Sequence, residues 1–273
     1  MPLDRLHLPA DARFWPAAAR AVAHFAIRHG APERQLQSVT WLVPGGQHAE
    51  LARAALHSEL GGRAFMPPRI VPLTAWLGQP MATGTAARVE LFTALRANRW
   101  VREAFGAQPA TLWALARDVA LLCDELTLAA VSGAEDFDGR LQTSLRRHFH
   151  RRAAHALQAQ SQLVIQLWRV RREADDGAAR FLRELAARAT RTLLPLVYLG
   201  TGLSTAGRTP LATWERAFID RAAEQAPVLL LVPDVTAALA DQPLLAAAWP
   251  ELGGSDTGTA IACLLYTSPS PRD

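Results

Sequence analysis

The chain has 273 residues, half of them hydrophobic, and a formal net charge of +4, so it is long enough for one large domain or two small ones with buried cores. No apolar run is long enough to span a bilayer, and the N-terminal segment lacks the apolar core of a signal peptide. We therefore expect a cytoplasmic protein without membrane contact. All 29 basic residues are arginine, and the absence of lysine excludes both a Walker A loop and a lysine nucleophile.

A first helix is predicted over Asp11–Arg28, with Asp11 as its cap. The apolar residues of this segment recur at helical spacing and so define one inward face. They are Phe14, Ala18, Val22, Phe25 and Ala26.

The segment Ser38–Leu60 predicts a strand, a glycine turn and a helix, which is the first step of a parallel α/β sheet. Val39–Val43 is a short apolar run of strand-forming residues. The inward face of the helix consists of Leu51, Ala55, Leu56 and Leu60. The turn consists of Pro44, Gly45, Gly46 and Gln47. Such a turn often holds a phosphate, but the lysine of a nucleotide site is missing, so we interpret the loop as degenerate.

A second short strand is predicted at Arg69–Pro72, followed by a helical turn with Thr74 as cap, and Gly78–Thr85 is interpreted as a subdomain boundary. From Ala86 to Thr190 the pattern is almost entirely helical. The predicted helices are Ala86–Ala97, Trp100–Phe105, Thr111–Ala130 with Thr111 as cap, Gly139–Asp175 and Gly177–Thr190.

Two cysteines, Cys123 and Cys263, indicate neither a disulfide framework nor a metal site, because they have no ligand spacing. Cys123 falls in an apolar helical pattern. A small buried side chain is therefore favoured over a reactive thiol.

Positive charge is concentrated between Arg140 and Arg191, where 12 arginines stand against four acidic residues, a local charge of +8. A basic segment of this kind is a candidate surface for the phosphate backbone of DNA. The candidate DNA-binding residues are Arg146, Arg147, Arg151, Arg152, Arg169, Arg171 and Arg172. The alternative is a solvated helix face. The apolar residues between these arginines, Trp168 among them, favour a core over a base-stacking platform.

The pattern then returns to α/β. Leu193–Leu199 and Val228–Val232 are continuous apolar runs that predict buried strands, the second ended by Pro233. Between them, Gly200–Gly207 is a loop and Pro210–Gln225 an amphipathic helix. Its inward positions are Leu211, Trp214, Phe218 and Ile219. Apolar strands separated by helices predict a parallel sheet covered on both faces.

The sequence contains no recognisable catalytic constellation. Leu193–Leu199 has no acidic residue at its carboxyl end for a Walker B site, so ATP hydrolysis is not expected. Asp234 and Glu251 make no nuclease set without lysine, and the histidines of residues 148–155 have no carboxylate or cysteine at ligand spacing. We therefore expect no catalytic residue, metal site or cofactor in this chain.

Four segments carry a family resemblance. They are VTWLVPGGQHAELARAAL at Val39–Leu56, PPRIVPLTAWL at Pro67–Leu77, LARDVALLCDELTLA at Leu115–Ala129 and LVYLGTGLSTAGRTPLATWERAFI at Leu196–Ile219. In this order and spacing they resemble the N-terminal part of AddB-type subunits of bacterial helicase–nuclease complexes, often described as PD-(D/E)xK nuclease family proteins. The similarity covers nearly all of residues 1–250.

The resemblance implies an α/β fold of the superfamily 1 helicase type: a degenerate RecA-like parallel sheet with a large inserted all-helical subdomain. Residues 1–80 would form the first part of the RecA-like subdomain, 81–191 the basic helical insertion, 192–250 the return to the sheet and 251–262 a loop. Some relatives keep a Walker A loop before the LVP strand. The matching region here, Leu6–Arg20, has none, which implies an inactive Walker A site.

The implied function is a truncated helicase-like DNA-binding scaffold, without ATPase or nuclease residues, of an exonuclease subunit that acts in double-strand break repair by recombination. Its partners would be DNA, held through the backbone, and an AddA-type helicase–nuclease subunit. The family's nuclease domain, with its iron–sulfur cysteines, would lie downstream. The alternative, from another class, is a protein-interaction scaffold that binds no DNA.

The last residues, Cys263–Asp273 (CLLYTSPSPRD), resemble the translation of a transposase-type sequencing adapter. We therefore expect a non-native tail, native sequence that ends near Ala262 and a truncated reading frame. Cys263 would then have no biological role.

Overall fold

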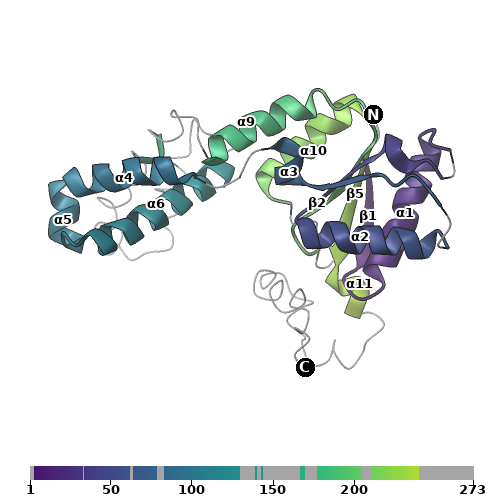
Figure 1. Ribbon diagram of the computed structural model, residues 1–273, viewed down its shortest axis with the longest axis horizontal. Coiled ribbons are helices and arrows are strands. Elements are labelled where there is room, and N and C mark those ends of the chain that lie inside the picture. The colour runs from purple at the N-terminus through teal and green to yellow at the C-terminus, as the bar shows by residue number, and fades with distance from the viewer. Residues whose placement is uncertain are drawn as a thin grey trace. The chain divides into compact units, whose positions relative to one another are not determined.

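The computed structural model describes residues 3–32, 34–61, 64–78, 83–129, 139, 143, 167–169, 177–204 and 211–239. Its frame is a five-stranded sheet in which all paired strands run parallel, in the order β1-β5-β4-β2-β3 (Figure 1). The chain separates into two compact units, Met1–Trp76 with Arg188–Asp273, and Leu77–Ala187. The mixed α/β class and the parallel sheet are therefore confirmed.

The strands are β1 (Leu3–Pro9), β2 (Thr40–Val43), β3 (Arg69–Pro72), β4 (Leu196–Leu199) and β5 (Val228–Asp234). Every residue of β2, β4 and β5 is buried. Burial on both faces explains why these strands appear in the sequence as unbroken apolar runs rather than as alternating ones. The predicted strands at β2, β3, β4 and β5 are confirmed, although β4 begins only at Leu196.

Helices cover both faces of the sheet. The helices of this unit are α1 (Phe14–Arg28), α2 (Gly46–Glu59), α3 (Leu73–Leu77), α10 (Thr213–Gln225) and α11 (Val235–Leu239), with a 3-10 helix η1 at Leu36–Ser38. α1 and α2 share one core cluster with Val197 of β4. The next residue, Tyr198, contacts Phe218 of α10 on the opposite face, with ring centroids 5.7 Å apart. Successive strand residues point to opposite faces, so Val197 packs on the side of α1 and α2 and Tyr198 on the side of α10.

Two features of the sheet differ from the prediction. The edge strand β1 was not predicted, because a strand paired on one side only has a weak apolar pattern: LDRLHLP has one fully buried residue, Leu8. The expectation that Pro233 ends β5 is wrong, since the strand continues to Asp234. The carbonyl of Pro233 faces the β4 side, where it accepts the Ser204 backbone N–H at 2.7 Å. β4 ends at Leu199, so no residue of β4 lies beside Pro233 to require a backbone N–H from it, and the proline is tolerated.

The helices also differ in detail. α1 begins at Phe14 rather than Asp11, and its predicted inward residues are all buried. In α2 the expectation for Leu51 is wrong, because this side chain is 43% exposed. The buried face of α2 is instead built from small residues that permit close helix packing. It consists of Ala49, Ala52, Ala55 and Leu56.

The second unit is helical where it is described. Its helices are α4 (Thr85–Ala97), α5 (Arg99–Phe105), α6 (Pro109–Ala129) and α9 (Gly177–Ala189). The first three share a core of Leu91, Leu95, Val101, Leu112, Ala116 and Ala120. Thr111 is not a cap, because α6 begins at Pro109, where the fixed φ of proline suits a first helical position.

The predicted helix Gly139–Asp175 lies largely outside the described residues. Of this stretch, the structure describes Gly139, Thr143 and 167–169, all helical. The indole N–H of Trp168 donates to Thr127 Oγ1 at 2.9 Å, and Trp168 is 2% exposed. Trp168 is therefore a core residue, as predicted, and Cys123 beside it is the buried small side chain that the sequence favours.

One carboxylate joins the two ends of the helical unit. Asp124 on α6 accepts the backbone N–H and the hydroxyl of Thr83, at 2.8 and 2.9 Å, just before α4 begins. It also accepts the Ala178 N–H, at 3.2 Å, in the first turn of α9. A carboxylate at a helix N-terminus is favoured by the helix dipole. Asp124 lies in the LCDEL segment of the family resemblance, and its role here is structural.

Gly177→Ala should destabilise the chain by about 2 to 4 kcal/mol. Gly177 has a φ of +49°, and an added Cβ would lie 2.6 Å from Asp124 Oδ1 and 2.7 Å from Thr83 Oγ1. Urea denaturation followed by circular dichroism measures the change. The control is Gly46→Ala, which opens onto free space at the start of α2; equal stability of both variants would contradict the Asp124 arrangement.

Candidate functional site

The carboxyl edge of the sheet is the natural place for a ligand in this fold. β2 and β4 are neighbours, but the chain leaves β2 through α2 on one face and β4 through α10 on the other. Open α/β sheets bind their ligands at such a topological switch point, outside the carboxyl ends of the strands. The predicted loop at Pro44–Gln47 directly follows β2 and so lies at this edge.

The loop at Pro44–Gln47 offers no cation. Gly45 precedes α2 with extended backbone and no side-chain cap, and Gly46 and Gln47 are exposed. The next side chain, His48, is partly buried, and this burial lowers its pKa, so it is neutral at pH 7. In this loop, the backbone N–H groups at the start of α2 remain to bind an anion, and without a cationic side chain they form a weak site.

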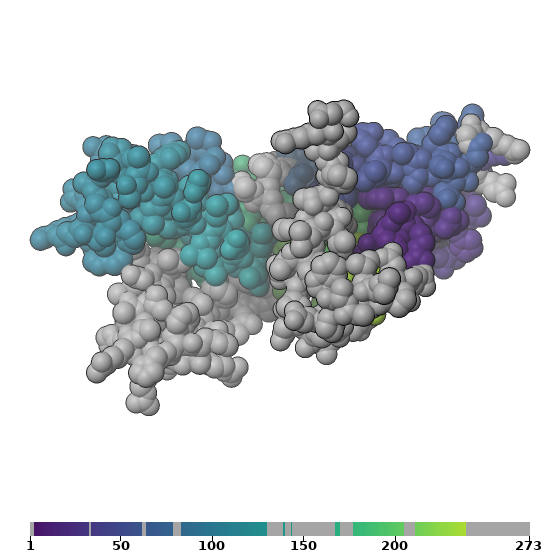
Figure 2. Space-filling model, turned by 90° about the horizontal axis from the view of Figure 1, so that it is seen from below, coloured from purple at the N-terminus to yellow at the C-terminus, as the bar shows by residue number. Residues whose placement is uncertain are grey.

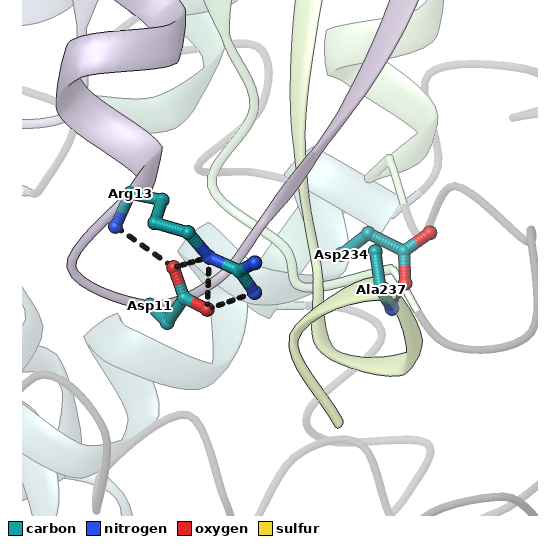
Figure 3. A network of polar contacts seen from close by, with 4 residues as sticks. All are labelled: Asp11, Arg13, Asp234 and Ala237. Atoms are coloured by element: carbon teal, nitrogen blue, oxygen red, sulfur yellow. Dashed lines mark hydrogen bonds and ion pairs between the residues drawn. The ribbon is translucent and has the colours of Figure 1, made fainter. Parts of the chain in front are cut away.

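The loop between β1 and α1 lies before β2, in the region where some members of the family that the sequence resembles have a Walker A loop. It consists of Ala10–Arg13 and contains no glycine. Asp11 Oδ1 accepts the Arg13 backbone N–H at 2.8 Å, and both carboxylate oxygens accept the Arg13 guanidinium, at 2.7 to 3.2 Å (Figure 3). The Arg13 guanidinium holds the pKa of Asp11 below its usual value, so the carboxylate is ionised at neutral pH.

The Asp11–Arg13 ion pair carries no net charge, so the loop presents no concentrated positive charge to a phosphate. Asp11 also engages the arginine of this loop that could otherwise contact an anion. The β1–α1 loop therefore has the position of a nucleotide loop without its positive charge.

A second carboxylate, Asp234, ends β5 at the same edge (Figure 3). It is 6% exposed; Oδ1 accepts the Ala237 backbone N–H at 3.1 Å, and Oδ2 lies 3.3 Å from His7 Nδ1. In the sequence, Asp234 was a candidate only for a nuclease set. The signal that could have placed it is its position directly after a buried apolar run in a parallel sheet.

A third carboxylate, Glu215, is fully buried behind the loop that follows β4. It accepts the Tyr198 hydroxyl at 2.6 Å, the Thr201 hydroxyl at 3.0 Å and the Ala212 backbone N–H at 3.0 Å. Every oxygen of this carboxylate thus has a donor, and the loop is tied to both β4 and α10. Burial, together with the charge of Glu215 and its hydrogen bond, raises the pKa of Tyr198 well above its usual value.

The candidate DNA-binding arginines fall mostly outside the described residues. Of the seven, the structure describes only Arg169, which is exposed on the helical turn 167–169. α9 adds described arginines from the same basic segment. Arg180, Arg183 and Arg188 are exposed on α9, and Arg191 just after it. The opposite face of α9 is buried, at Ala178, Phe181, Leu185 and Ala189.

A shallow groove of about 600 Å³ runs between β1 and α1. Its charged lining is largely neutralised internally, because Arg28 pairs with Asp4 at 2.9 Å and Arg20 pairs with Glu59 at 2.9 Å. The groove therefore lacks the concentrated positive charge expected of a phosphate site.

Comparison with known proteins identifies no relative: no protein-family model, curated protein or solved structure matches the chain. Among the described residues, no three histidine, cysteine or acidic side chains are grouped so that they could hold a metal ion. In the same part of the chain, no helix has the length and apolar character needed to cross a bilayer.

ATP with Mg²⁺ should not bind the chain at a Kd below about 1 mM, because Asp11 engages Arg13 in the β1–α1 loop and the chain has no lysine for a phosphate loop. Isothermal titration calorimetry measures this directly. Saturable binding in the micromolar range would contradict this prediction.

Glu215→Ala should lower the free energy of unfolding by about 3 kcal/mol, because several buried donors lose their acceptor. Glu224→Ala is the matched control on the same helix, since Glu224 is 57% exposed and only pairs with Arg221. Denaturant titration of both variants measures the difference. Equal losses would mean that Glu215 does not tie the loop to the sheet.

Tyr198→Phe should flatten the loss of stability at high pH. The raised pKa of Tyr198 means that its contribution is fully present below about pH 10, the unfolded value, and is lost as pH rises above it. The chain has no lysine and only two tyrosines, and arginine does not titrate in this range, so the difference between wild type and variant reports on Tyr198. Thermal melts from pH 9 to pH 11.5 test it; identical pH profiles for wild type and variant would refute it.

Proposed function

We propose that this chain is the N-terminal, catalytically silent helicase-like region of an AddB-type subunit, a DNA-binding scaffold in double-strand break repair by recombination. The observation that carries the proposal is the β1–α1 loop. A strand, loop and helix are present where the resemblance puts a Walker A loop, yet the loop holds Asp11 and Arg13 in a closed pair. The strand, loop and helix therefore agree with the position that the resemblance implies, while the residues of the loop do not form a nucleotide site.

The architecture supports a RecA-like sheet with a helical insertion. β3 and β4 pair with the same strand, β2, on opposite sides, although Leu77–Ala187 forms a separate compact unit between them in the sequence. A sheet interrupted in this way, with helices on both faces, agrees with the domain arrangement that the resemblance implies.

DNA is the proposed ligand because of the basic helical segment. Arg180 and Arg183 lie on the exposed side of α9, away from its buried apolar face, whereas Arg188 stacks on Trp76 at 5.0 Å. Arginines contact phosphates without reading base edges, and the proposed binding is accordingly independent of sequence. We propose that the scaffold acts in the cytoplasm beside an AddA-type subunit, with catalysis and any cofactor outside this chain.

A protein-interaction scaffold is the second candidate. Leu193 and Leu194, between α9 and β4, are 81% and 51% exposed, and adjacent exposed leucines are a usual feature of docking surfaces. On this reading a partner protein, rather than DNA, would bind at these leucines of the α/β unit.

The chain should bind a fluorescent forked DNA with strong salt dependence. Changing Arg146, Arg147, Arg151 and Arg152 to Ala should reduce the slope of log K against log salt by about 3, because each lost phosphate contact removes roughly 0.7 to 0.9. Fluorescence anisotropy at several salt concentrations measures the slope.

The matched control removes four arginines from the α/β unit instead, at Arg5, Arg34, Arg69 and Arg216, all exposed. It changes the net charge equally and should alter the slope much less. Absence of DNA binding in all three proteins would reject the DNA scaffold and favour the protein-interaction scaffold.

A further inference from the structure

At one end of the helical unit α5 joins α4 and α6 (Figure 1), and three aromatic residues of this end are exposed. Trp100 and Phe105 of α5 are 40% and 43% exposed, and Trp113, near the start of α6, is 39% exposed. The rings of Trp100 and Phe105 contact each other edge to face, with centroids 6.1 Å apart. Trp113 makes a similar contact with Phe92 of α4, at 5.7 Å.

These rings are not required to complete the core. Val101 of α5 is 1% exposed and Leu112 of α6 is fully buried, and both belong to the cluster that closes this end of the unit. The three aromatic residues are not part of this buried cluster, and each keeps about two fifths of its surface exposed. The described residues of α4, α5 and α6 are among the teal atoms of Figure 2.

Unpaired positive charge accompanies the rings. Arg99 pairs with Glu103 at 2.7 Å, whereas Arg96 and Arg102 are exposed and, among the described residues, have no ion pair. Arg102 lies three residues before Phe105, so the two side chains are neighbours on the helix surface. Free guanidinium groups beside exposed rings are the two components of a platform for single strands, on which bases stack and phosphates are neutralised.

We propose that the aromatic end, defined by Trp100, Phe105, Trp113, Arg96 and Arg102, binds single-stranded DNA by stacking bases on its rings. This inference rests on the proposed DNA-binding function and assigns it a second, chemically different contact surface. A duplex keeps its base faces stacked internally, so the aromatic end favours single strands over duplexes. Arginine and aromatic residues are also enriched at protein interfaces, so a protein partner is the alternative outcome of the test.

The test measures binding of a fluorescent 20-nucleotide oligo(dT), and of a duplex of the same length, to the full chain. The double variant Trp100→Ala/Phe105→Ala should weaken oligo(dT) binding about tenfold or more, with little change for the duplex. The matched control, Leu121→Ala/Leu122→Ala, removes two side chains that are 50% and 39% exposed on α6 and should bind like wild type.

The conservative variant Trp100→Phe separates a lost contact from a folding defect. It should keep its affinity for oligo(dT), and oligo(dT) should quench its tryptophan fluorescence less than that of the wild type. If wild type and the Trp100→Ala/Phe105→Ala variant bind oligo(dT) equally, the inference is wrong and the proposed function stands. If neither protein binds any DNA, both are wrong, and the aromatic end is then assigned to a protein contact.

Discussion

The parallel pairing of β1 with β5 is the constraint on which the α/β unit depends. Its register runs without a break from Leu3 opposite Val228 to Pro9 opposite Asp234, so residues more than 220 positions apart in the printed sequence form one ladder. Parallel strands cannot be joined by tight turns, and each connection therefore crosses the sheet. The same pairing brings the ends of β1 and β5 to one edge, where Asp11 pairs with Arg13 and Asp234 lies beside His7.

Two carboxylates then hold connections between elements in place. The buried Glu215 fastens the loop after β4, and the partly buried Asp124 fastens both ends of the helical unit. Both residues lie in segments that carry the family resemblance, and in both cases the contacts are to backbone N–H groups and hydroxyls of the same chain. Recognisable motif residues therefore support the architecture here, and the chemistry of a nucleotide site is absent from the edge where the fold would place it.

The sequence predicted β2, β4, β5 and most helices for two reasons. A strand buried on both faces is a continuous apolar run, and a helix buried on one face has apolar residues at helical spacing. It did not predict β1, an edge strand with Asp4, Arg5 and His7 among its residues. It also ended β5 too early, because the N–H that Pro233 lacks is not needed beside β4, which ends at Leu199. The Asp124 contacts span 41 and 54 residues, and no local pattern records such a distance. Of the predicted arginines, the described residues include only Arg169, so the basic surface stays a prediction.

The central claim is that DNA lies on the helical unit and avoids the carboxyl edge of the sheet. Photo-crosslinking of the chain to a forked DNA carrying 5-iodouracil, followed by mass spectrometry of the crosslinked peptides, tests this claim most directly. The account predicts crosslinks within residues 85–191 and none at Ala10–Arg13 or Pro44–Gln47. Crosslinks confined to those two loops would contradict it.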